Sequence, residues 1–468
     1  MTDQTESPGG LPKKIEKVVY IFNMSEDVWP FISAITDKKL HQWEIDDNAD
    51  LSDRGELFTN ADTEGLIYIT PKKIEESYIA YVKDLFSIKT LEILVPEIHT
   101  GVICDDILRD EKIMARLVEA ANSVRKLTLT SYSTSPQFLH LIDVLRSKDI
   151  TVYTPESPEI DCAWTVNFFG SKSGIRQLVQ MSGAKEPDLV MPEGVVCSGI
   201  IDASKIAANK FIKENGVVLK TNKGHSGSGV LIFRDSDLPH EYKTCERAIY
   251  DILAKDVYWE QFPIVIESLI QVNPSIAGGF PNVEFKIQKN GKIEFLYYCG
   301  LRVTKDGVFH GIEINQDIVS DRVSARIIDT GFFVAEQYSA AGYRGYFDID
   351  FAASKNAEIY VTESNTRRTG GTHAYKAAEL LIGKDFMQDS YVLSDNALTL
   401  PDSVTTFSQV HDALLSVIFD KRTKEGVVIA SANLIRQHRF AYVIFGNNKK
   451  RALEIEVQME GLLKELTS

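Results

Sequence analysis

Three things are scarce in this sequence: paired cysteines, long apolar runs and excess positive charge. The chain has 468 residues and only five cysteines, none of them in a CxxC pair, which disfavours a zinc site or a disulfide framework. No apolar run approaches the ~20 residues that a membrane helix needs. The polar start also lacks the basic and apolar segments of a secretory signal. We therefore expect a cytoplasmic protein without membrane contact.

The charge balance narrows the partners further. The formal net charge is −15, so broad electrostatic attraction to nucleic acid or anionic lipid is unfavourable. Apolar residues make up 44% and charged residues 25%, which is the profile of an ordinary globular protein. A chain of this length is expected to form roughly two to four domains. Small molecules are the expected partners.

The first part of the chain is predicted to be one α/β domain over residues 15–165. Strand-like runs alternate with helical patterns there, which indicates a largely parallel sheet covered on its faces. The strand-like runs are 18–22, 66–69, 91–95 and 127–130, and the helical patterns are 74–85, 113–123 and 137–146. The polar residues 1–14 are predicted to be a disordered tail.

The remainder is predicted to be an α+β core and a small C-terminal unit. Helical patterns at 172–181 and 203–214 precede several strands in hairpin arrangements, so we place the core at 166–390 with a lid over about 200–265. Residues 391–405 read as a linker, because Ser, Asp, Asn and Pro cluster there. Residues 406–468 are predicted to be a small C-terminal α/β domain.

A glycine-rich loop joins the predicted strands 217–221 and 230–233. Its glycines let the backbone approach a phosphate closely, and Lys220 at the end of the first strand can reach the same anion. It is not a Walker loop, because Gly-Lys-Ser/Thr before a helix is missing, and a following strand excludes the Rossmann pattern. A flexible hairpin tip without a ligand is the alternative. The loop residues are Gly224, His225, Ser226, Gly227, Ser228 and Gly229.

An acidic hairpin gives a stronger signal. Asp350 lies on one predicted strand, and Glu363 and Asn365 lie two apart on the next, so they share a face. Two carboxylates and an amide oxygen suit a hard cation that also holds phosphate oxygens, as magnesium does. Arg367 adds a bidentate cation to that face. A solvated polar sheet face is the alternative.

A third element is the apolar strand 264–270, which a single glutamate interrupts. Backbone groups of Ser268, Leu269 and Ile270 could read the edge of a purine, with Glu267 accepting from its exocyclic amine. Taken alone, an outward-facing acid on a partly exposed strand is the simpler interpretation.

Together these elements resemble the ATP-grasp superfamily in order and rough spacing. That resemblance implies a fold in which two α+β subdomains hold ATP. It also implies that Lys172 and Lys220 contact phosphates, that the 224–229 loop closes over them, and that Glu267 contacts adenine. Asp350, Glu363 and Asn365 would bind two magnesium ions, with manganese as an alternative. Arg367 would steady the transferring phosphoryl group or a substrate carboxylate.

A narrower resemblance is to the pheganomycin-type peptide ligases. It rests on the segment 169–176 and on the Asn365-Thr366-Arg367 stretch running into Gly371-Thr372-His373. Members carry a pre-ATP-grasp domain, an ATP-grasp core and a short C-terminal domain. The sequence departs from their pattern at Thr369, Gly371 and Ala374.

The resemblance implies an ATP-dependent carboxylate–amine ligase that forms a peptide bond through an acyl phosphate and releases ADP and phosphate. Arg302 is a further candidate for a substrate contact, and His373 could orient the amine or the carboxylate, although a structural loop histidine is equally compatible. The substrates would be amino acids or peptides, and a homo-oligomer such as a dimer is possible. A polyamine-type acceptor, or a non-catalytic ATP-binding module, are the alternatives.

Overall fold

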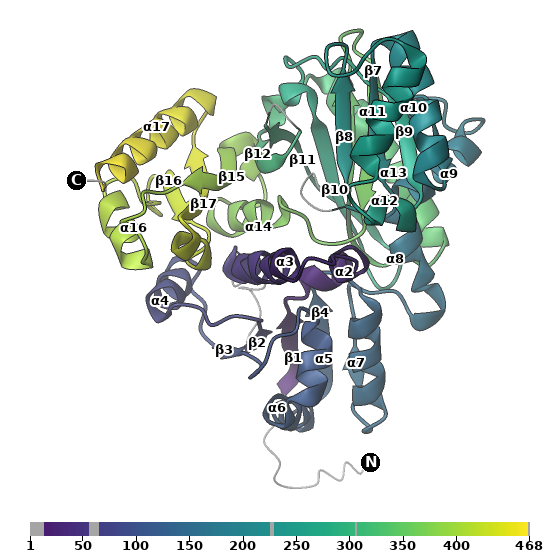
Figure 1. Cartoon of the computed structure of the whole chain (residues 1–468). Coiled ribbons are helices and arrows are strands. Elements are labelled where there is room, and N and C mark those ends of the chain that lie inside the picture. Colours follow the sequence, from purple (N-terminus) through teal and green to yellow (C-terminus); the bar gives the residue numbers. More distant parts are fainter. Residues whose placement is uncertain (1–13, 56–64, 225–228, 305–306, 467–468) are drawn as a thin grey trace, which may run out of the picture.

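The computed structural model describes residues 14–55, 65–224, 229–304 and 307–466 (Figure 1). Of the tail expected over 1–14, only Lys14 falls within these ranges, and it begins the first strand. Among the described residues, no helix is both long and apolar enough to cross a membrane.

The N-terminal unit is a five-stranded parallel sheet in the order β3-β2-β1-β4-β5, which confirms the predicted parallel α/β architecture. Its alternating apolar side chains, among them Val19, Ile67 and Leu129, are fully buried against the covering helices. The strands are β1 (Lys14–Ile21), β2 (Leu66–Ile69), β3 (Leu91–Leu94), β4 (Val124–Ser131) and β5 (Val152–Tyr153). The helices are α1 (Met24–Asp27), α2 (Trp29–Ser33), α3 (Lys38–Asp50), η1 (Leu51–Asp53), α4 (Glu76–Leu85), α5 (Ile103–Arg109), α6 (Glu111–Asn122) and α7 (Pro136–Arg146).

A second unit is a four-stranded antiparallel sheet in the order β6-β9-β7-β8, shown at the upper right of Figure 1. Helix α10 (Ile200–Glu214) packs on it through Ala203, Ala207 and Phe211. The strands are β6 (Gly194–Cys197), β7 (Gly216–Thr221), β8 (Val230–Arg234) and β9 (Ile264–Ser268), and the other helices are α11 (Tyr242–Leu253) and α12 (Tyr258–Gln261). We call this unit the lid sheet. The segment that connects it to the N-terminal unit contains, in order, η2 (Ile160–Cys162), α8 (Trp164–Phe169) and α9 (Lys172–Ser182).

The third unit is an eight-stranded sheet in the order β14-β13-β10-β11-β12-β15-β17-β16. Its strands are β10 (Pro281–Ile287), β11 (Ile293–Val303), β12 (Phe309–Ile314), β13 (Gly345–Ala353), β14 (Ile359–Asn365), β15 (Tyr391–Thr399), β16 (Gly426–Ile429) and β17 (Arg439–Gly446). Its helices are η3 (Ala277–Gly279), η4 (Gln316–Ile318), α13 (Asp321–Ala340), α14 (Thr372–Leu381), α15 (Phe386–Asp389), α16 (Phe407–Leu414), η5 (Asn433–Gln437) and α17 (Lys449–Glu465).

The prediction of a linker over residues 391–405 is wrong for residues 391–399. Tyr391–Thr399 is strand β15, which pairs with β12 on one side and β17 on the other, so the large sheet runs without a break into the C-terminal residues. The polar residues that suggested a loop have partners instead. Asp395 accepts from the ring of His310 at 2.6 Å, and the Ser394 hydroxyl accepts from the Ile312 backbone.

Candidate active site

An acidic surface lies where strands β10, β13 and β14 run side by side. The register places Asp350 opposite both Glu363 and Asn282, and Asp348 opposite Asn365. Because side chains alternate along a strand, all five project from one face of the sheet. The hairpin predicted between β13 and β14 is present, with the Ser354 N–H donating to the Glu358 carbonyl across its turn.

Two amides clamp the two aspartates of this face. The Asn282 Nδ2 group donates to Asp348 at 3.0 Å and to Asp350 at 2.7 Å. The Asn365 side chain donates to the same pair at 3.0 and 3.3 Å. Burial, together with neighbouring carboxylates, raises the pKa of both aspartates. The surface therefore holds more negative charge than its surroundings stabilise.

A bound magnesium ion would neutralise this excess negative charge. Asp350, Glu363 and Asn365 supply oxygen donors only, which is the ligand chemistry of a hard cation. Among the residues that the structure describes, no group of three Asp, Glu, His or Cys side chains is arranged so that it could hold a metal ion by itself. Magnesium commonly takes one or two carboxylates and completes its shell with phosphate and water, so the set suits an ion that arrives with a nucleotide.

Two lysines from different elements reach the same hairpin. Lys172, in the first turn of α9, donates to Glu363 Oε1 at 2.8 Å. Lys220, at the end of β7, lies 3.3 Å from the carbonyl oxygen of Thr362. Burial would raise the pKa of Glu363, but Lys172 and then Lys220 lower it below its usual value. The structure thus brings together both predicted phosphate lysines and the acidic hairpin.

Glu267, which was predicted to accept a hydrogen bond from adenine, forms ion pairs with two basic side chains. Its carboxylate lies 2.7 Å from Lys220 Nζ and 2.5 Å from Arg176, with all three side chains buried. Burial opposes the charge, but Lys220 and Arg176 hold the pKa of Glu267 below its usual value. Glu267 is therefore the counter-ion of Lys220. The expected adenine contacts of Glu267 and of the stretch 268–270, at and just after the end of β9, stay predictions.

The glycine hairpin is described only at its two ends. Gly224 follows β7, and Gly229 precedes β8 with a φ of +81°. A Cβ atom on Gly229 would come 2.3 Å from the Thr221 hydroxyl, so this position requires glycine. The predicted phosphate contacts of His225, Ser226, Gly227 and Ser228 lie outside the described residues.

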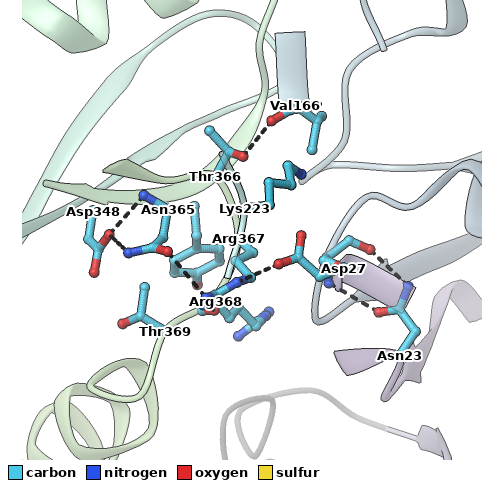
Figure 2. A network of polar contacts seen from close by, with 12 residues as sticks. Asn23, Asp27, Val166, Lys223, Asp348, Asn365, Thr366, Arg367, Arg368 and Thr369 are labelled. Carbon is cyan, nitrogen blue, oxygen red and sulfur yellow. Dashed lines mark hydrogen bonds and ion pairs between the residues drawn. The ribbon is translucent and has the colours of Figure 1, made fainter. Parts of the chain in front are cut away.

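Arg367 is the one member of the three predicted catalytic residues that lies beside the acidic hairpin. Its guanidinium donates to the side-chain amide oxygen of Asn365 at 3.2 Å and to Asp27 of helix α1 at 2.8 Å (Figure 2). Burial would lower the pKa of Arg367, but Tyr132, Asp27 and Asp348 raise it. The guanidinium therefore stays charged.

The two other catalytic candidates lie elsewhere. Arg302 is on the opposite face of β11 from Cys299, whose thiol contacts Asn282, and it pairs with Glu456 of helix α17 at 2.8 Å. His373 is 4% exposed, and burial, reinforced by the nearby Arg54, lowers its pKa to about 3. The imidazole is therefore neutral near pH 7. The ion pair of Arg302 with Glu456 disfavours the predicted substrate contact of Arg302, whereas the orienting role predicted for His373 stays a prediction.

Sequence reasoning missed Asp348 and Asn282. Asp348 could have been found, since it lies two positions before Asp350 on the same strand and must share its face. Asn282 gives no local signal, because it joins the site only through the pairing of β10 with β13.

Comparison with solved structures identifies the class of fold. N5-carboxyaminoimidazole ribonucleotide synthetase in complex with ADP superposes with a TM-score of 0.54 and 12% identity, covering 98% of this chain and 99% of that one. Biotin carboxylase of Campylobacter jejuni, solved with an ATP analogue, gives 0.59 and 13%, covering 94% and 90%. A biotin carboxylase domain of Hydrogenobacter thermophilus, bound to magnesium ADP and bicarbonate, gives 0.54 and 12%, covering 92% and 86%. The chain has the ATP-grasp fold.

One curated protein is distantly similar in sequence. The L-propargylglycine–L-glutamate ligase of Streptantibioticus cattleyicolor is 25% identical over an alignment of 340 residues, and the match covers 68% of this chain. The match spans 66% of the length of that relative. No family model matches the chain.

Proposed function

We propose that the protein is an ATP- and magnesium-dependent ligase that joins a carboxylate to an amine and forms an amide bond. The observation that carries this proposal is the meeting of Lys172 and Lys220 with the acidic hairpin. The lysines come from α9 and the lid sheet, and Glu363 comes from the large sheet. Cations opposite a hard-cation site are what a triphosphate with its metal requires.

The reaction follows from charge placement. Asp350, Glu363 and Asn365 would hold magnesium, which when bound neutralises negative charge on phosphate oxygens. Lys172 and Lys220 would face the phosphates, and Arg367 would face the group that is transferred. Activation of a substrate carboxylate as an acyl phosphate, followed by attack of a neutral amine, needs positioning and electrostatics but no side-chain nucleophile.

The relative's substrates direct the choice of test compounds. That enzyme is named for joining L-propargylglycine to L-glutamate, so an amino acid as the carboxylate donor and an amino acid as the amine are the first pair to examine. A peptide could replace either amino acid under the same proposal, because the chemistry at the reacting carboxylate and amine is unchanged.

The test is a phosphate-release screen of amino acids, with L-glutamate among them, and short peptides, with product masses. ADP and phosphate should appear only when a carboxylate and an amine are both present. Glu363→Gln and Lys220→Ala should lower turnover by roughly 10²–10³-fold, by analogy with the loss of one transition-state donor. Glu358→Gln is the matched control, because Glu358 is an exposed acid in the turn that precedes β14.

Other outcomes would contradict the proposal in distinct ways. AMP and pyrophosphate would mean a different activation step. Turnover with polyamines alone would leave the amide-forming reaction in place but rule out an amino acid as the amine. Nucleotide binding without turnover across the whole panel would favour a regulatory module.

A further inference from the structure

The guanidinium of Arg367 is held on three sides. Nε donates to Asp27 at 2.8 Å, one terminal nitrogen to Asn365 at 3.2 Å and the other to the backbone of Arg368 at 3.1 Å. Figure 2 shows Asp27 reaching it from helix α1, opposite Asn365. Asn365 and Arg367 belong to the large sheet and its following loop, whereas Asp27 belongs to the N-terminal unit. One carboxylate therefore links the parallel sheet to the acidic hairpin.

Asp27 is fixed in place by the short turn that follows β1. Asn23 exchanges two hydrogen bonds with the backbone of Ser133, at 3.0 and 3.1 Å. Ser133 in turn forms an isolated antiparallel bridge with Arg367 itself. Glu26, next to Asp27, is buried and accepts from the Cys104 N–H at 2.7 Å. The backbone that carries Asp27 is thus fastened to the same segment that its carboxylate contacts.

The Asp27 carboxylate also offsets the positive charges of the side chains around it. Lys223, which donates to Asn167 at 2.8 Å, lies near Arg367 and Lys172. Burial lowers the pKa of Lys223, and these two cations lower it further, whereas Asp27 opposes them. Without Asp27, the cations beside the hairpin would repel one another, and Arg367 would lose the bond to its Nε. Its guanidinium would then be free to turn away from Asn365.

We propose that Asp27 is a positioning residue that holds Arg367 against the acidic hairpin, which makes the N-terminal unit a working part of the phosphoryl-transfer site. The inference rests on the proposed function. Asp27 itself need not touch substrate. Misplacing a charged group by about 1 Å can cost about 10²-fold in rate, so the fixed orientation of this guanidinium matters more than its mere presence.

The first test compares Asp27→Asn with the wild type. The amide keeps the shape but loses the charge, and kcat should fall about 10–100-fold, as is typical when a supporting partner is removed. The KM for ATP should change little. The thermal midpoint should fall only moderately and the protein should stay folded at the assay temperature, because the Arg367 and Asp27 side chains are 14% and 16% exposed and water screens part of the lost pair. Asp105→Asn is the matched control, since Asp105 pairs loosely with Arg109 on the surface of the same unit. That control should retain wild-type kcat.

A double-mutant cycle separates positioning from general stability. In an Arg367→Lys background, Asp27→Asn should cost less than about 3-fold, because the group that Asp27 orients is already gone. Equal losses in both backgrounds would overturn the inference. So would an unchanged kcat in Asp27→Asn, or a loss of kcat that disappears once the unfolded fraction at the assay temperature is subtracted.

A binding measurement keeps the inference testable if no substrate pair is found. Magnesium ADP with aluminium fluoride mimics the transferring phosphoryl group, so Asp27→Asn should weaken binding of that complex by about 10-fold or more, while binding of magnesium ADP alone stays near the wild-type value. Equal affinity of both proteins for the fluoride complex overturns the role of Asp27. Lack of turnover by the wild type with every substrate bears on the proposed ligase instead.

Discussion

Replacing Glu267 by glutamine distinguishes a counter-ion from an adenine ligand. The carboxylate lies 2.5 Å from Arg176 and 2.7 Å from Lys220, and the three side chains are 3%, 6% and 10% exposed. The amide is nearly isosteric but uncharged. Glu267→Gln therefore leaves two buried cations facing each other, with one neutral oxygen between them.

The expected loss is large because water cannot screen these charges. Removing one partner of a buried ion pair costs about 3–5 kcal/mol, since the remaining charge stays buried without compensation. In this case two cations are left, and their repulsion adds to the loss. We therefore expect the free energy of unfolding to fall by at least about 3 kcal/mol for the transition that contains the lid sheet.

Urea denaturation at pH 7, followed beside a surface control, checks this value. Glu246→Gln removes an acid from the exposed Lys243–Glu246 pair on α11, where the nitrogen and oxygen lie 3.0 Å apart, and should cost under about 0.5 kcal/mol. If Glu267 were instead an adenine ligand, glutamine would raise the KM for ATP and weaken discrimination against GTP, with stability unchanged. That combination would refute the counter-ion role.

Three further predictions follow from single positions. Gly229→Ala should destabilise the glycine hairpin by about 1–2 kcal/mol, because a positive φ disfavours a side chain there, and should raise the KM for ATP in steady-state assays. The folded-state pKa of His373 is about 3, below its unfolded value of about 6.5, so its stabilising contribution is complete above pH ~6.5 and is lost as the pH falls. Between about pH 7 and pH 5 the wild type should lose about 2 kcal/mol more than His373→Gln in denaturant titrations, and equal slopes would contradict its burial as a neutral group. Arg302→Met should cost about 1–3 kcal/mol of stability by leaving Glu456 without its cation, yet keep kcat within about 3-fold, whereas a large fall in kcat at unchanged stability would restore Arg302 as a catalytic candidate.

The sequence predicted those parts of the fold that rest on local patterns. A short apolar run located β2 at Leu66–Ile69 without error, and a turn signal between two strands predicted the hairpin that carries Asp350 and Glu363. Strand β15 was not predicted, because its middle residues are polar and their hydrogen-bond partners lie on β12, far away along the chain.

Pairing between distant segments also decided which polar residues belong to the site. Arg302 and Arg367 look equally suited to bind an anion when only their neighbours in sequence are known. Only the sheet register shows that Arg302 points to the face occupied by Glu456, while Arg367 lies beside Asn365. Asp27 is missed for the same reason, since 340 residues separate it from Arg367 in the chain.

Each cation that the proposed reaction needs already has a carboxylate partner. Lys172 pairs with Glu363, Lys220 with Glu267, and Arg367 with Asp27. Two of these carboxylates, Glu267 and Asp27, lie outside the acidic hairpin, so a metal bound at the hairpin would not compete with them. Only Glu363 would have to exchange Lys172 for a metal, and the released ammonium would then be free for a phosphate. Charges that are oriented before the substrate arrives need little reorganisation during the reaction, and such preorganisation is the main source of electrostatic catalysis.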